Sequence, residues 1–272
     1  MVGAGCKGRI KTVIFTAVLS AGLFCCFNFA AAQPQEKWNE EKSGHFIIYY
    51  KNAPGDFISL LAEKAEDYYD TITQELGFAR FDFWTWDARA QIYVFDSSED
   101  YRRVTGQPSW SAGAVAVEQK IISTYAFARG FTEAMLPHEI GHIIFREFVG
   151  FRNPAVPLWL DEGVAAYREK ERYSTAKEFL RGKKAKGGFY SLEQLSAIKK
   201  AQGLDQQSAQ VFYNESFSLV DFLISDHGSR AFVIFCRNLR DKEDLKEAVA
   251  SSYPFKSLEE MEEGWLDYLE KG

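Results

Sequence analysis

Cysteine is scarce in this chain of 272 residues, and its distribution limits the chemistry that the fold can use. Of the four cysteines, three lie within the first 26 residues, so Cys236 is the only one in the rest of the sequence. If the N-terminal segment is removed, the remaining chain cannot form an internal disulfide. Cys236 ends the apolar run 231–236, which favours a buried packing thiol over a nucleophile.

An excess of positive charge is also absent, since 32 lysines and arginines face 38 aspartates and glutamates and the formal net charge is −6. Removal of an N-terminal leader with its three basic residues would lower this charge to about −9, by −6 − 3. An acidic surface disfavours binding to nucleic acid and electrostatic attachment to anionic lipid. The sequence contains no internal repeat and no low-complexity linker, which indicates one domain.

No acidic residue precedes Glu36, and residues 1–32 have the three parts of a secretory signal peptide. Three basic residues come first, an apolar run from 13 to 29 follows, and three alanines end at Ala32. This order predicts cleavage after about Ala32. Because the apolar run is long, an uncleaved membrane anchor is the alternative. We therefore expect an exported protein, periplasmic or secreted, or one that this segment anchors in the membrane.

The remaining residues, 33–272, are enough for a single domain with a sizeable core. Segments rich in β-branched and aromatic residues predict strands, and amphipathic segments predict helices. The predicted strands are 45–51, 90–95, 112–117 and 120–125. The predicted helices, apart from those that carry the motifs described next, are 56–76, 97–104, 192–200, 208–225, 230–239, 242–250 and 257–269. Strands in the first half and helices in the second predict an α+β fold.

Histidine is as scarce as cysteine, yet two of the four histidines stand four residues apart in His138-Glu139-Ile140-Gly141-His142. On a helix, side chains at this spacing share a face, so both imidazoles can reach one cation. Two neutral imidazoles with an open coordination position suit zinc. Glu139 can accept a proton from a zinc-activated water without binding the metal itself. A surface helix with two solvated histidines is the alternative, which the apolar flanking residues disfavour.

A second motif occupies residues 159–167 and follows Pro157, a residue that is well tolerated in the first turn of a helix. The motif continues with helical periodicity, so the sequence predicts a second helix here. Small residues such as Gly163 and Ala165 would let this helix pack closely against the first and bring Glu162 to the same cation. Without the first motif, an exposed helical glutamate would be the simpler interpretation of Glu162.

Together, the two motifs resemble those of the gluzincin zinc peptidases of the thermolysin-like clan. The resemblance is to the small peptidase MA-like bacterial domains and, more distantly, to the aminopeptidase N group. It implies that His138 and His142 bind zinc and that Glu162 is the third ligand. Glu162 follows His142 after 19 intervening residues, one more than is usual in the aminopeptidases. The resemblance also implies a thermolysin-like zincin architecture, with an N-terminal mixed αβ lobe, a C-terminal helical lobe and the zinc between them.

The resemblance also bears on the residues that support the ligands. Glu169 lies seven residues after Glu162, where the aminopeptidase group carries a glutamate, and it is suited to orient a ligand histidine. An exposed charge within the segment 168–172 is the alternative interpretation of Glu169. A thermolysin-type aspartate four residues after the third ligand is absent, because Ala166 stands there. The groups that support the two histidines therefore stay open.

Tyr213 takes a catalytic role through the same resemblance. It lies where the aminopeptidase group carries a tyrosine at the start of a helix, whose hydroxyl stabilises the tetrahedral oxyanion. An aromatic residue at the edge of the core is the alternative. His227 is the rival oxyanion donor, although its position before Gly228 favours a simpler role at the C-terminus of a helix.

These residues predict an exported zinc-dependent peptidase that acts on peptide or protein substrates. In the family, the region here numbered 112–125 supplies an edge strand, and the open backbone groups of such a strand can pair with an extended peptide. The glutamate-bearing motif with which aminopeptidases bind a free amino terminus is absent, which favours an endopeptidase. The alternative is an exported scaffold or binding protein that retains the fold and the zinc without turnover. The sequence does not indicate which oligomeric state the protein adopts.

Overall fold

A computed structural model of the chain describes residues 37–78, 84–109, 111–169, 173–201 and 203–271. The predicted leader, residues 1–32, lies outside the described residues. Residues 37–272 form one compact unit. Within the described ranges, no helix combines the length and the apolar character that crossing a bilayer requires.

Among the described residues, five strands form one mixed sheet in the order β1-β2-β3-β5-β4. The strands are β1 (Asn39–Lys42), β2 (Phe46–Tyr50), β3 (Ala90–Phe95), β4 (Gly113–Ala116) and β5 (Ile121–Tyr125). The three central strands β2, β3 and β5 are parallel, and their register aligns Ile48 with Ile92 and Ile92 with Ile122. All three isoleucines are fully buried, as expected for strands covered on that face. The antiparallel strands β1 and β4 form the two edges of the sheet.

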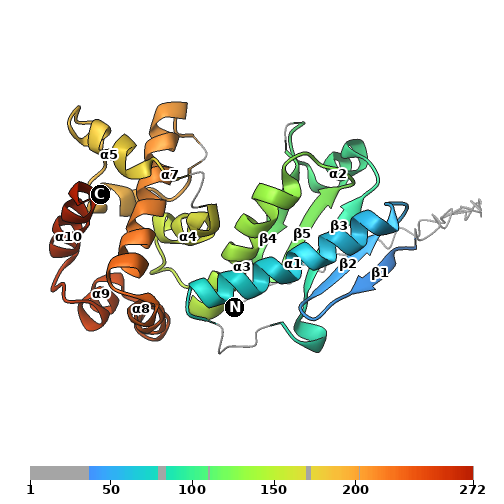
Figure 1. Cartoon of the computed structure of the whole chain (residues 1–272), viewed down its shortest axis with the longest axis horizontal. Helices are drawn as coiled ribbons and strands as arrows, with labels where there is room; N and C mark the ends of the chain where they lie inside the picture. Colours follow the sequence, from blue (N-terminus) through green and yellow to red (C-terminus); the bar gives the residue numbers. More distant parts are fainter. Residues whose placement is uncertain (1–36, 79–83, 110, 170–172, 202, 272) are drawn as a thin grey trace, which may run out of the picture. The chain divides into compact units, whose positions relative to one another are not determined.

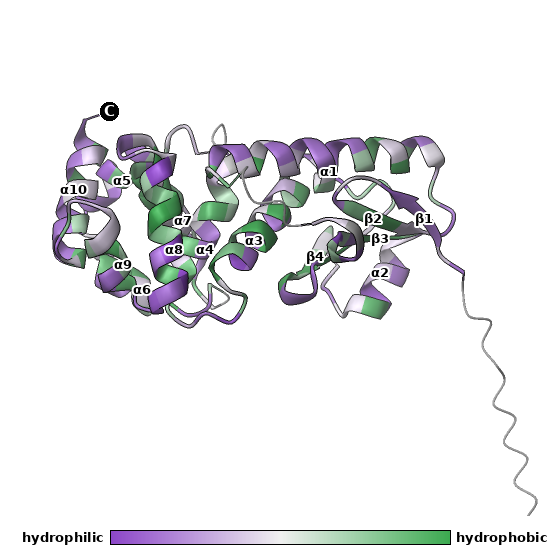
Figure 2. Cartoon of the chain, turned by 90° about the horizontal axis from the view of Figure 1, so that it is seen from below, coloured by the Kyte–Doolittle hydropathy of each residue, from purple (hydrophilic) through white to green (hydrophobic). Residues whose placement is uncertain are grey.

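Three longer helices belong to the N-terminal half: α1 (Gly55–Glu75), α2 (Ser98–Thr105) and α3 (Leu136–Val149). Figure 2 shows hydrophilic and hydrophobic segments alternating along α1, the pattern of a helix with one buried face. The side chain of Ser97 accepts a hydrogen bond from the backbone N–H of Asp100, so Ser97 caps the N-terminus of α2. Short 3₁₀ turns lie at Trp86–Ala88 and Val117–Gln119.

The sequence allows two starts for the helix that carries His138. The helix could begin at Thr132 and kink at Pro137, or it could begin near Pro137. A π-helical turn, Phe131–Met135, precedes α3, which begins at Leu136 with Pro137 in its first turn. The α-helical part therefore starts near Pro137, but the helical backbone already begins with the π-helical turn, since the N–H of Leu136 donates to the carbonyl oxygen of Phe131.

The C-terminal half is helical, so the predicted α+β class is confirmed. Figure 1 shows α4 between the sheet-bearing half and the later helices. These elements are α4 (Leu158–Ala166), a 3₁₀ turn (Tyr167–Glu169), α5 (Ala176–Lys184), α6 (Leu192–Ala197), α7 (Gln206–Asp221), a π-helical turn (Phe222–Asp226), α8 (Ser229–Lys242), α9 (Leu245–Ser252) and α10 (Leu258–Glu270). The helix predicted over 208–225 therefore ends as a π-helical turn, and the one predicted to begin at 242 begins at Leu245.

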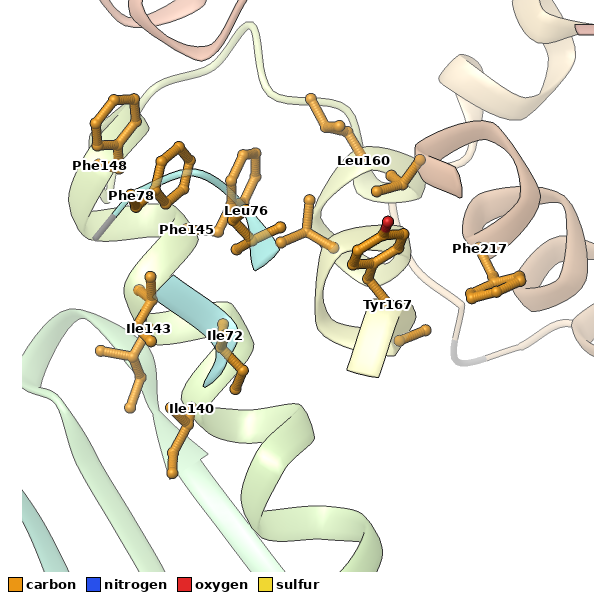
Figure 3. Close-up of a cluster of buried hydrophobic side chains, with 14 of the residues drawn as sticks. Ile72, Leu76, Phe78, Ile140, Ile143, Phe145, Phe148, Leu160, Tyr167 and Phe217 are labelled. Atoms are coloured by element: carbon orange, nitrogen blue, oxygen red, sulfur yellow. The ribbon is translucent and has the colours of Figure 1, made fainter. Parts of the chain in front are cut away.

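The apolar faces of α3 anchor it in the core. Figure 3 shows Ile140, Ile143, Phe145 and Phe148 of α3 beside apolar side chains of α1 and Phe78. The rings of Phe78 and Phe148 stack with centroids 4.0 Å apart. This packing fixes the rotation of α3 about its axis, so the remaining polar edge of the helix has one direction in which to point.

Candidate metal centre

The polar edge of α3 carries the two histidines of the first motif. His138 and His142 lie one turn apart, and their Nε2 atoms are 3.2 Å from each other. The rings are nearly perpendicular, with an interplanar angle of 84°. His142 is buried and His138 is half-buried. The i, i+4 spacing thus directs both Nε2 atoms toward one point.

Helix α4 brings the third residue to this point. Glu162 Oε2 lies 3.6 Å from His138 Nε2 and 3.7 Å from His142 Nε2. The three side chains form the only group of three or more possible ligands found among the described residues. The convergence that the two motifs predict is therefore present, although 19 residues separate Glu162 from His142.

Small residues allow α3 and α4 to approach each other, but not every small residue expected at this contact lies there. A Cβ on Gly141 of α3 would lie 3.0 Å from the Cα of Ala165 on α4, so glycine and alanine meet at the contact. Gly163 was expected at this interface, and that expectation is wrong. A Cβ on Gly163 would lie well inside 3.0 Å of the backbone carbonyl oxygen of Ser216, which places Gly163 against α7.

The separations of the three donor atoms fit a tetrahedral zinc ion. With ligand bonds of about 2.0–2.1 Å, two ligand atoms of a regular tetrahedron lie about 3.3 Å apart. The observed separations of 3.2, 3.6 and 3.7 Å are close to that value. Two imidazole nitrogens and one carboxylate oxygen are also donors that zinc accepts. The residues could therefore hold this metal.

The far side of each imidazole contacts a carboxylate. His138 Nδ1 is 3.0 Å from Glu169 Oε1, and His142 Nδ1 is 3.0 Å from Asp161 Oδ1. An ionised carboxylate can only accept, so each Nδ1 donates its proton to the carboxylate, and in the neutral imidazole this leaves the lone pair of Nε2 for a cation. Glu169 lies in the 3₁₀ turn that follows α4, not in α4 itself.

Asp161, the partner of His142, was not predicted from the sequence. Arg146 on α3 was missed with it, since its Nε donates a hydrogen bond of 2.7 Å to Asp161 Oδ2. Thermolysin-type sites have the supporting aspartate four residues after the third ligand. In this chain, the aspartate that contacts His142 is the residue directly before Glu162. The signal was present in the motif as an acidic pair on α4 and, on α3, as an arginine four residues after His142.

The charges of this cluster shift the protonation of its members. Burial acts to lower the pKa of His138, but the carboxylates of Glu162, Glu169 and Glu139 outweigh it and raise the pKa to about 10. Burial likewise opposes protonation of His142, and its carboxylate neighbour Asp161 raises that pKa. Among the protein groups alone, carboxylate charge therefore dominates and prepares the site for a cation.

Glu139 follows the first histidine and is half-buried. Burial raises the pKa of its carboxyl group, with the two histidines opposing this effect and the carboxylates of Glu162 and Asp161 adding to it. The metal-facing group contains His138, His142 and Glu162 but not Glu139. Glu139 thus interacts electrostatically with the candidate ligands, and its role as proton acceptor stays a prediction.

Tyr213 lies on α7 and is half-buried at the edge of the hydrophobic core. It lines a hollow of about 360 Å³ whose described walls come from 173–179 and 206–214. The candidate ligands are not among those walls. The geometry of the described residues therefore does not establish a contact between the Tyr213 hydroxyl and the three ligand side chains. The catalytic role of Tyr213 stays a prediction.

His227 and His45, the other two histidines, have different surroundings. His227 ends the π-helical turn after α7, and its ring packs edge-on against Phe222 and Phe255. Its place at the end of a helix is the one that the sequence favoured. His45 Nδ1 lies 2.6 Å from Glu66 Oε2 at the start of β2. Both residues thus have local neighbours of their own.

Residues 86–271 match the model of the Peptidase MA superfamily. This segment is more than half of the chain and includes α3, α4 and α7. The chain therefore belongs to the Peptidase MA superfamily, and the resemblance to gluzincin-type peptidase domains is confirmed. No curated protein sequence matches the chain.

Proposed function

We propose that this protein is a zinc-dependent peptidase, and specifically an exported endopeptidase. The observation that carries the proposal is the geometry of His138, His142 and Glu162, whose donor atoms have the separations of a tetrahedral zinc site. Membership of the Peptidase MA superfamily supports protease activity in general. The carboxylates behind both imidazoles support a metal-binding role, since such partners orient ligand histidines in zinc enzymes.

The proposed mechanism assigns one task to each group. Zinc held by the three ligands would acidify a water molecule and polarise the scissile carbonyl group. Glu139 accepts the proton of the attacking water and delivers it to the leaving amine. Tyr213 donates a hydrogen bond to the oxyanion. Asp161 and Glu169 hold the two imidazoles in the tautomer that presents Nε2 to the cation.

Substrate would bind along the edge of the sheet. Strand β4 pairs with β5 on one side and ends the strand order, so no further strand of the described residues pairs with its other side. An extended peptide can add to such an edge through backbone hydrogen bonds, with little dependence on its side chains. Binding of this kind needs no free terminus and supports internal cleavage.

The decisive experiment compares the zinc-loaded parent with Glu139→Gln. We expect the variant to keep its zinc, measured by elemental mass spectrometry, and to lose peptide hydrolysis by about 10²- to 10⁴-fold, because the proton acceptor is gone. The matched control is Glu133→Gln, an exposed glutamate in the preceding π-helical turn. Equal turnover by Glu139→Gln and the parent would contradict the mechanism. Zinc binding without any turnover in the parent would favour the non-catalytic scaffold instead.

Export is the second part of the proposal and depends on residues 1–32. The basic start, the apolar run and the three alanines of this segment support it. Mass spectrometry of the mature protein should find an N-terminus close to residue 33. Recovery of the uncut chain from the membrane fraction would favour an anchor, and recovery from the cytoplasm would contradict export.

A further inference from the structure

Two adjacent hollows lie between α5 and the N-terminal half of α7, two helices that run beside each other in Figure 1. The inner hollow, of about 360 Å³, contains Tyr213 in its wall. The outer hollow, of about 460 Å³, contains Lys183 and Lys186. Thr175 and Phe179 line both, so the two hollows adjoin along these residues. We call the two adjoining hollows the α5–α7 groove.

A chain of contacts links the inner end of the groove to the candidate metal centre. The backbone N–H of Tyr173, in the inner wall, donates to the carbonyl oxygen of Glu169, whose carboxylate contacts His138. The ring of Tyr173 stacks on Phe217 with centroids 4.7 Å apart, and Phe217 lies one turn beyond Tyr213 on α7. The groove therefore begins beside a residue that orients a candidate ligand.

The two ends of the groove differ in chemistry. The inner wall has aromatic rings, an alanine and carboxamides, and no charged side chain among the described residues that line it. The outer wall has two lysines and Glu178, a net charge of 2 − 1 = +1. Lys183 Nζ lies 5.2 Å from the centroid of the Phe179 ring, so a cation stands directly over the aromatic floor.

These lysines are available to a ligand. In the described part of the chain, neither Lys183 nor Lys186 forms an ion pair with a carboxylate, whereas neighbouring Lys184 lies 3.6 Å from Glu270. Lys186 also lies beyond the end of α5, so stabilisation of the last helical turn does not account for it. The charges of both lysines at the mouth of the groove are therefore not compensated by a carboxylate of the described residues.

We propose that the α5–α7 groove binds the peptide substrate at a distance from the cleaved bond and selects an acidic side chain. The aromatic floor packs against the apolar part of the peptide, and Lys183 and Lys186 bind the carboxylate. This inference rests on the proposed peptidase function and deepens it, because backbone pairing along β4 by itself would not discriminate between sequences.

The test uses zinc-loaded protein and a series of peptides that differ at one position, which holds Glu, Gln or Ala. The varied position is moved in turn to each place around one cleaved bond. At one place we expect kcat/KM to be about five- to tenfold higher for Glu than for Gln, as two partly exposed ion pairs allow. The preference should shrink as ionic strength rises, because exposed charges are screened.

The variant Lys183→Gln/Lys186→Gln should abolish the preference for Glu, so that the Glu and Gln peptides are cleaved with equal kcat/KM, and leave the zinc content unchanged. Lys184→Gln is the matched control, because this lysine is on the same helix end but lines neither hollow. Equal cleavage of the Glu and Gln peptides at every position by the parent would overturn the proposal. An equal loss of preference in Lys184→Gln would also overturn it, because only general surface charge would then act.

A binding measurement separates failure of the groove from failure of the peptidase function. Fluorescence anisotropy of labelled Glu and Gln peptides is measured on zinc-loaded Glu139→Gln, with and without the two lysine substitutions. If the parent cleaves no peptide but binding still depends on the lysines, the groove is supported and the peptidase function is wrong. If cleavage occurs without lysine-dependent binding or preference, the groove proposal is wrong and the peptidase function stands.

Discussion

Helix α3 and helix α7 both pack against α4, but the carboxyl groups on these two sides of α4 have pKa values shifted in opposite directions. On the α3 side, Asp161 lies between two basic groups, with His142 on one oxygen and Arg146 on the other. Burial acts to raise the pKa of Asp161, but these two basic neighbours lower it. The carboxylate therefore stays charged in the interior, where it can hold an imidazole in place.

On α7, Glu215 is fully buried without any basic partner among the described residues. Its Oε1 accepts a hydrogen bond of 2.9 Å from the backbone N–H of Tyr190, and its Oε2 has no hydrogen-bond partner. Burial and the nearby Glu262 raise the pKa of Glu215 to about 8, although the bond from Tyr190 opposes the shift. The fold therefore favours the protonated form of this carboxyl group up to about pH 8.

The two residues differ in how their surroundings compensate a negative charge: Asp161 stays ionised, whereas the surroundings of Glu215 favour its protonated form. A buried charge is tolerated only where an opposite charge or several donors compensate its lost hydration. The α3–α4 interface provides that compensation through histidine and arginine side chains. The surroundings of Glu215 provide one backbone N–H, so protonation takes the place of a partner.

Removal of the third candidate ligand should have the largest effect on the α3–α4 side. Glu162→Ala deletes one of three donors, and we expect zinc affinity to fall by more than about 100-fold, beyond what loss of a supporting residue costs. Peptide hydrolysis should fall with it. Competition with a fluorescent chelator measures the affinity, and Glu63→Ala, an exposed glutamate on α1, is the control. Unchanged zinc affinity would exclude Glu162 from the ligand set.

Glu215→Gln should change the pH dependence of stability on the α7 side. The pKa of Glu215 is raised from 4.5 to about 8 on folding, so its stabilising contribution is complete below pH 4.5 and is lost as pH rises to 8. Because glutamine does not titrate, the free energy of unfolding of the variant relative to the parent should increase over this window, by on the order of a few kcal/mol.

Urea unfolding of Glu215→Gln at a series of pH values measures this difference. The exposed residue Glu193 supplies the control variant Glu193→Gln, for which the difference from the parent should stay flat. A flat difference for Glu215→Gln as well would show that Glu215 titrates normally and would remove the contrast between the two sides of α4.

Asp161→Asn tests the support behind His142. The amide keeps the shape of the side chain but loses the charge that pairs with Arg146 and with the histidine, so zinc affinity should fall by about 10- to 100-fold. Asp67→Asn on the exposed face of α1 should leave the affinity unchanged. If the two variants bind zinc equally well, Asp161 supports only the packing of the helices.

Gly163→Ala probes the α4–α7 contact and has the smallest expected effect. The added methyl group would collide with the carbonyl oxygen of Ser216 and lower the free energy of unfolding by about 1–3 kcal/mol, despite the higher helix propensity of alanine. Gly182→Ala in α5 meets no atom within 4 Å and should stabilise by up to about 1 kcal/mol. Thermal or urea unfolding of both variants compares them. Equal stabilities would mean that α4 and α7 can separate at little cost.

The elements with strong local patterns were predictable. The central strands and α1 follow from runs of β-branched and aromatic residues and from helical periodicity that ends at Gly77, whose φ is +77°. Strand β1 was missed because its polar, mostly exposed residues become a strand only by pairing with β2. The helix predicted to start at 242 actually starts at Leu245, after its cap Asp244, because α8 extends through Lys242.

The spacing of His138 and His142 by itself determined that their Nε2 atoms would meet, because the geometry of a helix places residues four apart on one face. Only the tertiary structure decided that Glu162 joins them and that Asp161 and Arg146 support His142. These residues come from separate helices, and no local rule sets the distance between two helices. Here the packing of Gly141 on α3 against Ala165 on α4 sets the distance between the two helices.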